Sequence, residues 1–273
     1  MGLFNIFKKN NKEDHTPHPD IKISEIDNGS HGDNIGGLIG FNSLNNEDGR
    51  NFINELMAKA MIEESDLATK SYEIKSLPVS NNPNLKLRVL ANTKNVLSAF
   101  PYLKTSYKLP YSTKEIIEWK HMNKCEAEIR GGGRNVFGFD FFPTDYAINK
   151  AKYMENKEFQ LHVSAIAFVV DKSETNQNTE VKFSEDFVSY MPSSSLPRQT
   201  YYDFIGKVVD FNEVVLDNQN QGYIARVRLI NDDSDPDFFT VDMFMNRENM
   251  RVQAIEKGMK ISGLLWFQGE IAD

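Results

Sequence analysis

Asp140 and Asp242 are the acidic residues whose placement first suggests chemistry. Each lies in a run with the two-residue period of a half-buried strand, whose apolar positions are Phe137, Phe139 and Phe141 in one run and Phe239, Val241 and Met243 in the other. Two carboxylates that a pseudo-twofold axis brings together could share a proton and act as an acid–base pair. Because both lie on the strand face opposite the apolar one, outward, solvated carboxylates are the alternative interpretation.

The middle of the chain combines positive charge with aromatic residues. Residues 84–172 contain 14 Lys and Arg against 9 Asp and Glu, whereas residues 200–273 contain 7 against 13 and the whole chain has a net charge of −8. Single-stranded nucleic-acid sites pair a cationic groove with rings on which bases stack. The candidate binding residues are Arg130, Arg134, Lys150, Lys152, Tyr146 and Trp119.

The same charge pattern has a second explanation. A basic module and an acidic module can dock on each other without any ligand, and an acidic neighbour repels a polyanion. In addition, most rings of the basic region fall at alternating positions that are expected to face a core. We therefore predict a protein partner for the basic region, with single-stranded nucleic acid as the alternative.

Other groups of polar residues do not form a complete site. Gly131–Gly133 could present backbone N–H groups to an anion, or form a hairpin turn. The aspartates between 232 and 237 could hold Ca²⁺, but Phe238 and Phe244 occupy the Gly and Glu positions of an EF-hand loop. His121 and Cys125 form an isolated pair without further zinc ligands. We predict no catalytic residues, no metal and no cofactor.

A repeated β-α-β unit is the element that positions the two aspartates. After each alternating run comes a helical stretch and then a second strand, from Phe159 to Ala167 in the first copy and from Met259 to Phe267 in the second. In the second copy the helical stretch runs from about Asn246 to Glu256. Further helices are expected from Phe52 to Met61 and from Ser112 to Met122, where Ser112 and Glu115 form a capping box.

These elements predict a mostly β fold with some α-helix (α+β), built from two β-rich, barrel-like modules with flanking helices. Residues 1–49 are expected to form an irregular N-terminal arm, and residues 50–172 a basic α+β module. Residues 173–199 are polar and form the expected connector. Residues 200–273 form the acidic second module.

The second module resembles an OB-fold, a five-stranded barrel whose third and fourth strands are bridged by a helix. The resemblance rests on Lys257–Gly263, which is similar to the turn and fourth strand of many OB modules, and on Gly206-Lys207-Val208 in the first strand. It covers Tyr201 to Ile271, and in part Cys125 to Val170. The resemblance implies binding and does not specify the ligand.

The chain carries one Cys, which excludes an internal disulfide framework, and no apolar run reaches the length of a membrane span. The charge order of Met1–Lys9 is the reverse of a secretory signal. We therefore expect a cytoplasmic location.

The sequence predicts a non-catalytic interaction or scaffold protein, with single-stranded nucleic-acid binding as the alternative and an enzyme using Asp140 and Asp242 as the third hypothesis.

Overall fold

The computed structural model describes residues 16–31, 34–93, 95–133, 137–173, 186–194, 196, 200–232, 235 and 237–272. Within these residues the chain is mostly β-strand, with four α-helices and two short 3-10 helices, as the sequence predicts for the fold class. No helix in this part of the chain is both long enough and apolar enough to cross a membrane.

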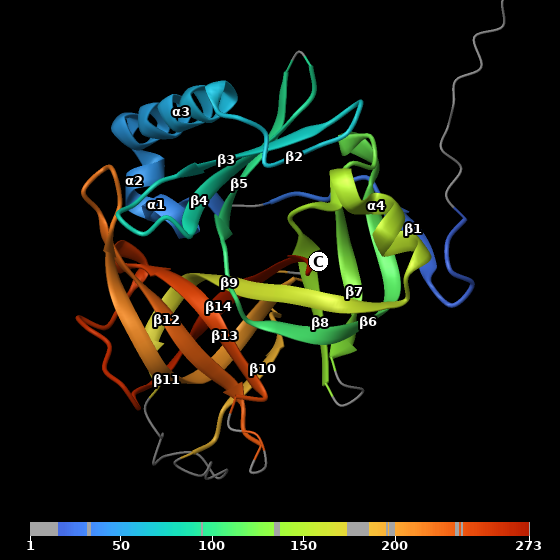
Figure 1. Ribbon diagram of the computed structural model, residues 1–273. Helices are drawn as coiled ribbons and strands as arrows, with labels where there is room; N and C mark the ends of the chain where they lie inside the picture. The colour runs from blue at the N-terminus through green and yellow to red at the C-terminus, as the bar shows by residue number, and fades with distance from the viewer. Residues whose placement is uncertain are drawn as a thin grey trace, which may run out of the picture.

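Two sheets organise the molecule (Figure 1). The ten-stranded sheet contains β1 (Lys22–Ile26), β6 (Lys108–Trp119), β7 (Ala127–Gly133), β8 (Phe137–Pro143), β9 (Glu158–Lys172), β10 (Ser189–Pro192), β11 (Tyr201–Val215), β12 (Gln221–Ile230), β13 (Phe239–Asn246) and β14 (Lys260–Ile271). The four-stranded sheet contains β2 (Leu67–Ala68), β3 (Glu73–Pro78), β4 (Leu85–Ala91) and β5 (Val96–Leu103). The helices are α1 (Asn34–Ile39), α2 (Phe41–Asn45), α3 (Glu47–Ile62), α4 (Tyr146–Glu155), η1 (Lys120–Met122) and η2 (Arg247–Asn249).

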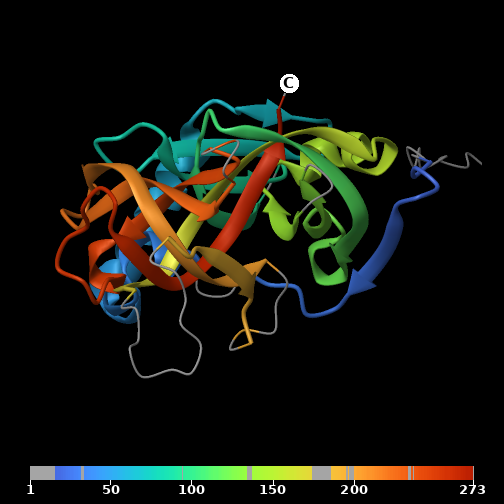
Figure 2. The ribbon, with the colours of Figure 1, turned by 90° about the horizontal axis from the view of Figure 1, so that it is seen from below.

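The large sheet closes into two rings that share the antiparallel pair β9–β14. The first ring runs β6-β7-β8-β14-β9 and returns to β6. The second runs β11-β12-β13-β9-β14 and returns to β11. In both rings the third strand pairs in parallel with a shared strand, and the other pairs are antiparallel. Figure 2 shows β14 running diagonally between the strands of the two rings.

The two rings repeat one another in register. Arg130 on β7 pairs with Asp140 on β8, and Arg226 on β12 pairs with Asp242 on β13. The centre of the repeat lies on the shared pair, where Ala165 of β9 is opposite Phe267 of β14. The stretch that ends near residue 170 and the stretch that ends near residue 267 therefore follow the same pairing scheme. The last strand of each stretch also forms part of the other ring.

Two apolar cores hold this arrangement. One fills the rings and includes Phe139, Phe141, Phe239 and Phe267. The other lies between the outer face of the shared strands, the small sheet and the helices α1 and α3; it joins Ile166, Phe168 and Trp266 of the rings to Leu87 of β4 and Leu56 of α3, among others. Figure 1 shows α3 lying across the four-stranded sheet. The helical spacing of residues 52–61 is confirmed, because α3 buries Ile53, Leu56 and Ala60.

Three sequence-based expectations about elements are wrong. Ser112–Met122 is not a helix: its first eight residues are in strand β6, and only η1 at its end is helical. Glu115, the expected capping residue, instead accepts hydrogen bonds from Ser24 and Arg130. The helix expected from 246 to 256 is reduced to η2. The expected irregular arm contains β1, α1 and α2. β1 pairs with β6 of the first ring, and Asn220 and Asn246 of the second ring donate hydrogen bonds to the carbonyl groups of Ile39 and Leu38 in α1.

Candidate functional site

A ladder of alternating charges crosses the first ring. Arg130 lies at its centre, with Nη1 2.8 Å from Oε2 of Glu115 on β6 and Nε 3.5 Å from Oδ2 of Asp140 on β8. Lys22 of β1 also pairs with Glu115, at 2.8 Å. Burial raises the pKa of Glu115, but hydrogen bonds from Lys22, Ser24 and Arg130 outweigh it, so the net shift is downward.

The second ring carries the same ladder at the same register. Asp210 on β11 is opposite Arg226, which is opposite Asp242, with 3.8 Å between Nε of Arg226 and Oδ1 of Asp242. A β-bulge precedes the first acid in both rings, between Thr113 and Glu115 and between Val208 and Asp210. Because the bulge shifts the alternation by one residue, it turns both acids toward the arginine on the outer face.

Asp140 lies in a pocket of about 490 Å³ between the first ring and the edge strand β10; we call it the Asp140 pocket. Its walls are formed by Gly131, Gly138, Asp140, Val188, Ser189, Tyr190, Pro192, Tyr202, Leu229 and Ile230. Burial raises the pKa of Asp140 to about 7, and the nearby Glu128 carboxylate adds to the shift, while Arg130 opposes it.

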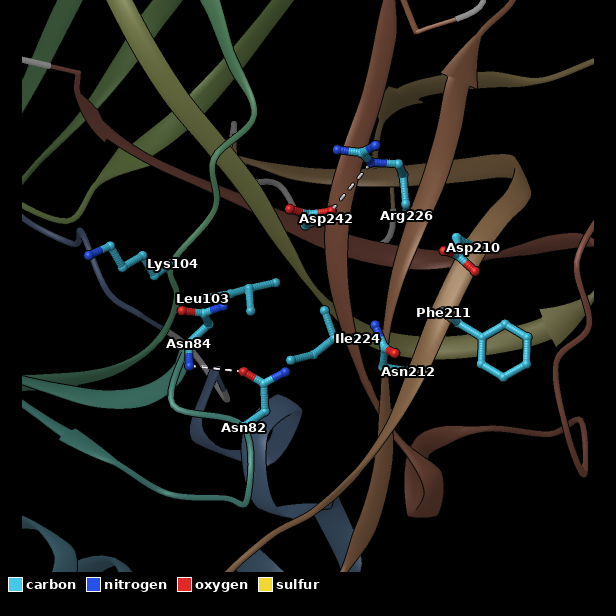
Figure 3. A pocket seen from close by; sticks show the side chains of 10 residues that line it. All are labelled: Asn82, Asn84, Leu103, Lys104, Asp210, Phe211, Asn212, Ile224, Arg226 and Asp242. Atoms are coloured by element: carbon cyan, nitrogen blue, oxygen red, sulfur yellow. Dashed lines mark hydrogen bonds and ion pairs between the residues drawn. The ribbon is translucent and has the colours of Figure 1, made fainter.

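Asp242 lies in a different cavity, of about 260 Å³, which we call the Asp242 groove. Figure 3 shows Asn82, Asn84, Leu103 and Lys104 on one side and Asn212, Ile224, Arg226 and Asp242 on the other, with the ring of Phe211 directed away. Thr105 donates a hydrogen bond from its hydroxyl to Oδ2 of Asp242, at 2.6 Å. The segment that follows β5 is thereby tied to β13 and forms one wall of the groove.

The two aspartates do not form an acid–base pair in this structure. They occupy equivalent positions in the two rings, but they line different cavities and each faces its own arginine. Sharing a proton requires two carboxyl groups within hydrogen-bond distance of each other. The arrangement therefore gives two separate polar cavities, each with a carboxylate at its wall.

No protein-family model, curated protein or solved structure matches this chain. The site must therefore be interpreted from its own geometry. Its repeated unit is an acid–arginine–acid ladder on the outer face of a closed ring, beside a cavity that differs between the two copies.

The structure separates the sequence-predicted binding residues into small groups. Arg130 is in the first ladder. Lys150 of α4 forms an ion pair with the buried Glu118, which also accepts a hydrogen bond from Tyr146 at 3.0 Å. Lys152, also on α4, is exposed. The rings of Tyr146 and Trp119 are 1% and 2% exposed, so neither can receive a stacked base.

One predicted residue, Arg134, lies outside the described part of the chain. Three other cations of the middle region pair with acids from the N-terminal segment. Lys124 pairs with Glu25, Lys120 with Asp27 at 3.4 Å, and Lys157 with Asp20 at 2.9 Å. The Lys22–Glu115 pair has the opposite arrangement, with its cation on the N-terminal segment. Acids among residues 20–27 thus neutralise part of the excess positive charge of the middle region.

The remaining sequence candidates have structural roles or fall partly outside the described residues. Gly131–Gly133 are in strand β7, and a Cβ at Gly131 would lie 2.1 Å from the carbonyl oxygen of Ser112, so close strand packing requires glycine there. Of the Asp232–Asp237 loop, Asp233 and Pro236 lie outside the described part. Within the described residues, no group of three or more His, Cys, Asp or Glu side chains is placed to hold a metal ion.

Sequence reasoning missed a buried polar group around His31. Nε2 of His31 lies 2.8 Å from Oγ of Ser98 and 2.8 Å from Oε1 of Glu126. In a catalytic triad the serine and the acid use different ring nitrogens, so that the imidazole can pass a proton between them. Here both contact the same nitrogen, and we infer that the group anchors the N-terminal segment. These residues are far apart in sequence, and no local pattern links them.

Proposed function

We propose that this chain is a non-catalytic interaction protein and that the Asp242 groove binds an extended segment of a partner protein. The observation that carries the proposal is the lining of the groove, in which three asparagine side chains surround a small apolar surface. The three are Asn82, Asn84 and Asn212, and the apolar lining comes from the partly exposed Ile224 and the almost fully buried Leu103.

We also propose that the two rings are OB-like barrels arranged in tandem. In an OB barrel the first strand pairs with the second and fourth, and the third pairs in parallel with the fifth. The pairing order of each ring supports this proposal. In this assignment β9 is the fourth strand of the first ring and the fifth strand of the second, and β14 is the fifth strand of the first ring and the fourth strand of the second. The helix α4 then bridges the third and fourth strands of the first barrel. OB barrels bind ligands over strands two and three, which in the second ring are β12 and β13, the strands of the groove.

The chemistry of the groove fits a polypeptide. An asparagine amide offers two N–H donors and a carbonyl acceptor, which complement the alternating N–H and C=O groups of an extended backbone. Asn82 accepts a hydrogen bond from the backbone N–H of Asn84 at 3.0 Å, which orders the loop that carries both. An apolar side chain of the bound segment would contact Ile224.

The charges of the groove favour a neutral partner over a polyanion. Lys104 and Arg226 supply two positive charges, and Asp210 and Asp242 supply two negative ones. Asp210 is paired with Lys257 at 2.7 Å, and Arg226 is paired with Asp242. Phosphate binding depends on cations that can release counterions, and an arginine held by a carboxylate contributes less. Single-stranded nucleic acid stays the alternative hypothesis for this groove.

The experiment compares two tryptophan substitutions on neighbouring residues of β11. Asn212→Trp fills the groove, whereas Glu213→Trp places the same ring on the opposite face of the strand at an exposed position. Proteins captured from the native cell by the full-length chain are compared for the wild type and both variants. The proposal expects Asn212→Trp to lose at least one partner that Glu213→Trp retains.

Identical partner sets for the two variants would contradict the proposal. A titration of labelled single-stranded oligonucleotides across a salt series tests the alternative separately. Nucleic-acid binding requires an affinity that falls steeply with salt and that Asn212→Trp weakens, whereas a protein partner predicts no such titration.

A further inference from the structure

The Asp140 pocket combines an apolar body with one polar end. Val188, Pro192, Leu229 and Ile230 provide apolar wall, and Asp140 provides the carboxylate. The side chain of Asp140 is 21% exposed, so a ligand in the pocket can reach it. Small-molecule sites share this composition, in which a mostly apolar cavity holds a few directed polar groups.

The two equivalent aspartates differ in what satisfies them. Asp242 accepts a short hydrogen bond from Thr105, at 2.6 Å. Asp140 is approached by Nε of Arg130 at the longer distance of 3.5 Å and by the backbone N–H of Gly131. The closer partner of Arg130 is Glu115, at 2.8 Å. The carboxylate of Asp140 can therefore still accept a hydrogen bond from a ligand in the pocket. The corresponding acceptor of Asp242 is used by Thr105 within the protein.

Charged groups of both signs lie around Asp140 in the described part of the chain. Facing it or its partners are the acids Glu115 and Glu128 and the cations Arg130 and Lys22. Among the described residues, the lining of the pocket includes the Asp140 carboxylate and no cation, which favours a positively charged ligand at this end. Lys22 is itself 71% exposed and is hydrogen-bonded to Glu115, so solvent screens much of its contribution.

Two tyrosine rings line the pocket beside the carboxylate. Tyr190 and Tyr202 pack edge to face, with 5.5 Å between ring centroids. The hydroxyl of Tyr202 accepts a hydrogen bond from the backbone N–H of Asp140 at 2.7 Å, and the hydroxyl of Tyr190 donates one to the carbonyl of Gly138 at 3.0 Å. Both rings are thereby fixed, and aromatic faces next to a carboxylate are a favourable environment for an ammonium group.

We propose that the Asp140 pocket binds a primary ammonium group carried on an apolar stem. The ammonium group would pair with the Asp140 carboxylate beside Tyr190 and Tyr202, and the stem would contact Pro192 and Ile230. A small alkylamine and the lysine side chain of a partner protein share this chemistry. The site is separate from the Asp242 groove, so neither proposal depends on the other.

The pH dependence of binding follows from the state of the carboxylate. Only ionised Asp140 can pair with an ammonium ion, and its pKa of about 7 places the change within an accessible range. Tyr111, Tyr190 and Tyr202 stay neutral there, because burial raises the pKa of each hydroxyl above its ordinary value. Affinity for the amine is therefore expected to rise between pH 6 and 8.

The test titrates the full chain with n-butylammonium and with 1-butanol, followed by protein NMR at pH 8. Nα-acetyl-lysine amide provides the second amine source. We expect the amine to bind at least tenfold more tightly than the alcohol. Asp140→Asn should remove that preference, and Asp242→Asn, the matched change in the other ring, should leave it intact. Binding of both amines indicates a general ammonium site, and binding of one alone identifies the source.

Equal binding of amine and alcohol, no binding of either amine, or an unchanged preference in Asp140→Asn would overturn the proposal. The pH series on the wild-type protein keeps the test independent of how well the variant folds. An amine affinity that does not change between pH 6 and 8 would count against Asp140 even if the variant could not be prepared.

Discussion

Arg130 and Asp140 lie directly opposite each other on β7 and β8, with Nε of the arginine 3.5 Å from Oδ2 of the aspartate. The same pair recurs in the second ring as Arg226 and Asp242, at 3.8 Å. The equivalence of the two pairs shows that the rings repeat in side chains as well as in backbone. The surroundings of the two aspartates differ, and this difference gives the two cavities different chemical properties.

Asp140→Asn should change how stability depends on pH. Asp140 has a pKa of about 7 in the folded chain against 3.8 for the free group, so between those values the folded state binds more protons than the unfolded state. Stability of the wild type therefore falls as pH rises from about 4 to 7, by at most roughly 4 kcal/mol from this group. Removing the carboxylate should reduce that slope by the contribution of Asp140, as measured by urea unfolding at several pH values.

Asp242→Asn is the control for this measurement. Its carboxylate is held by Thr105 and Arg226, and the slope between pH 4 and 7 should persist in that variant. An unchanged slope in Asp140→Asn would show that another group, such as the buried Asp145, accounts for all of it. Burial also raises the pKa of Asp145, to about 6.

The alternating runs made much of the fold accessible from the sequence. Strands β8, β9, β13 and β14 were predicted from their two-residue period, and so was the equivalence of Asp140 with Asp242. The sharing of β9 and β14 between the rings was not predicted, because pairing partners are set by contacts between residues about a hundred positions apart. A local period contains no information about which distant strand completes a ring.

Strand β6 shows how tertiary contacts override a local signal. Ser112 and Glu115 have the spacing of a capping box, and the apolar residues after them fit a helix. The bulge between Thr113 and Glu115 breaks the alternation, and both Ile116 and Ile117 are buried. β6 pairs with β1, β7 and β9, so pairing on both edges fixes the extended conformation.

The site was less accessible than the fold. Arg130 was selected from its charge, but the acids that neutralise it come from β6 and β8, and the pocket beside it is completed by Tyr190 and Tyr202 from distant strands. Trp119 was selected as an aromatic near cations, and it is buried against His31 and Phe142. Exposure of a ring depends on what packs over it, which composition does not reveal.

Arg88→Met should destabilise the protein strongly. Arg88 of β4 is buried and joins the small sheet to the end of β14, with Nη1 2.9 Å from both Glu270 and Thr144 and its guanidinium 3.4 Å from the centre of the Tyr102 ring. Its loss leaves the partly buried Glu270 without its cation, which typically costs about 3–5 kcal/mol. The free energy of unfolding in urea measures the loss.

Two further variants show whether the pair is the cause. Arg88→Met combined with Glu270→Met should cost less than the sum of the single changes, because the second substitution removes the charge left unpaired. Lys86→Met, two residues earlier on the same strand, is half-buried and should cost less than about 1 kcal/mol. Strictly additive costs would argue against a role for the ion pair.

Cys125 should be inert in the folded protein. The side chain is 3% exposed, and burial raises the pKa of its thiol to about 12, with the neighbouring Glu126 carboxylate adding to the shift. Because the thiolate is the reacting species, labelling by a thiol reagent at pH 8 should be slower than that of the unfolded chain by several orders of magnitude. The rate should rise with urea in parallel with unfolding. Rapid labelling without urea would contradict the buried placement.

Gly263→Ala should disrupt the strand pair that both rings share. A Cβ at this position of β14 would lie 1.8 Å from the carbonyl oxygen of Val169 on β9, where the register shifts between Leu264 and Leu265. A backbone oxygen cannot rotate away as a side chain can, so the two strands must separate, at a cost of about 3 kcal/mol or more. Ser262→Ala is the matched control, since it changes the adjacent residue without adding an atom near β9. Equal unfolding midpoints for the two variants would show that β9 and β14 do not approach each other closely at Gly263. That result would also contradict the sharing of these strands between the two rings.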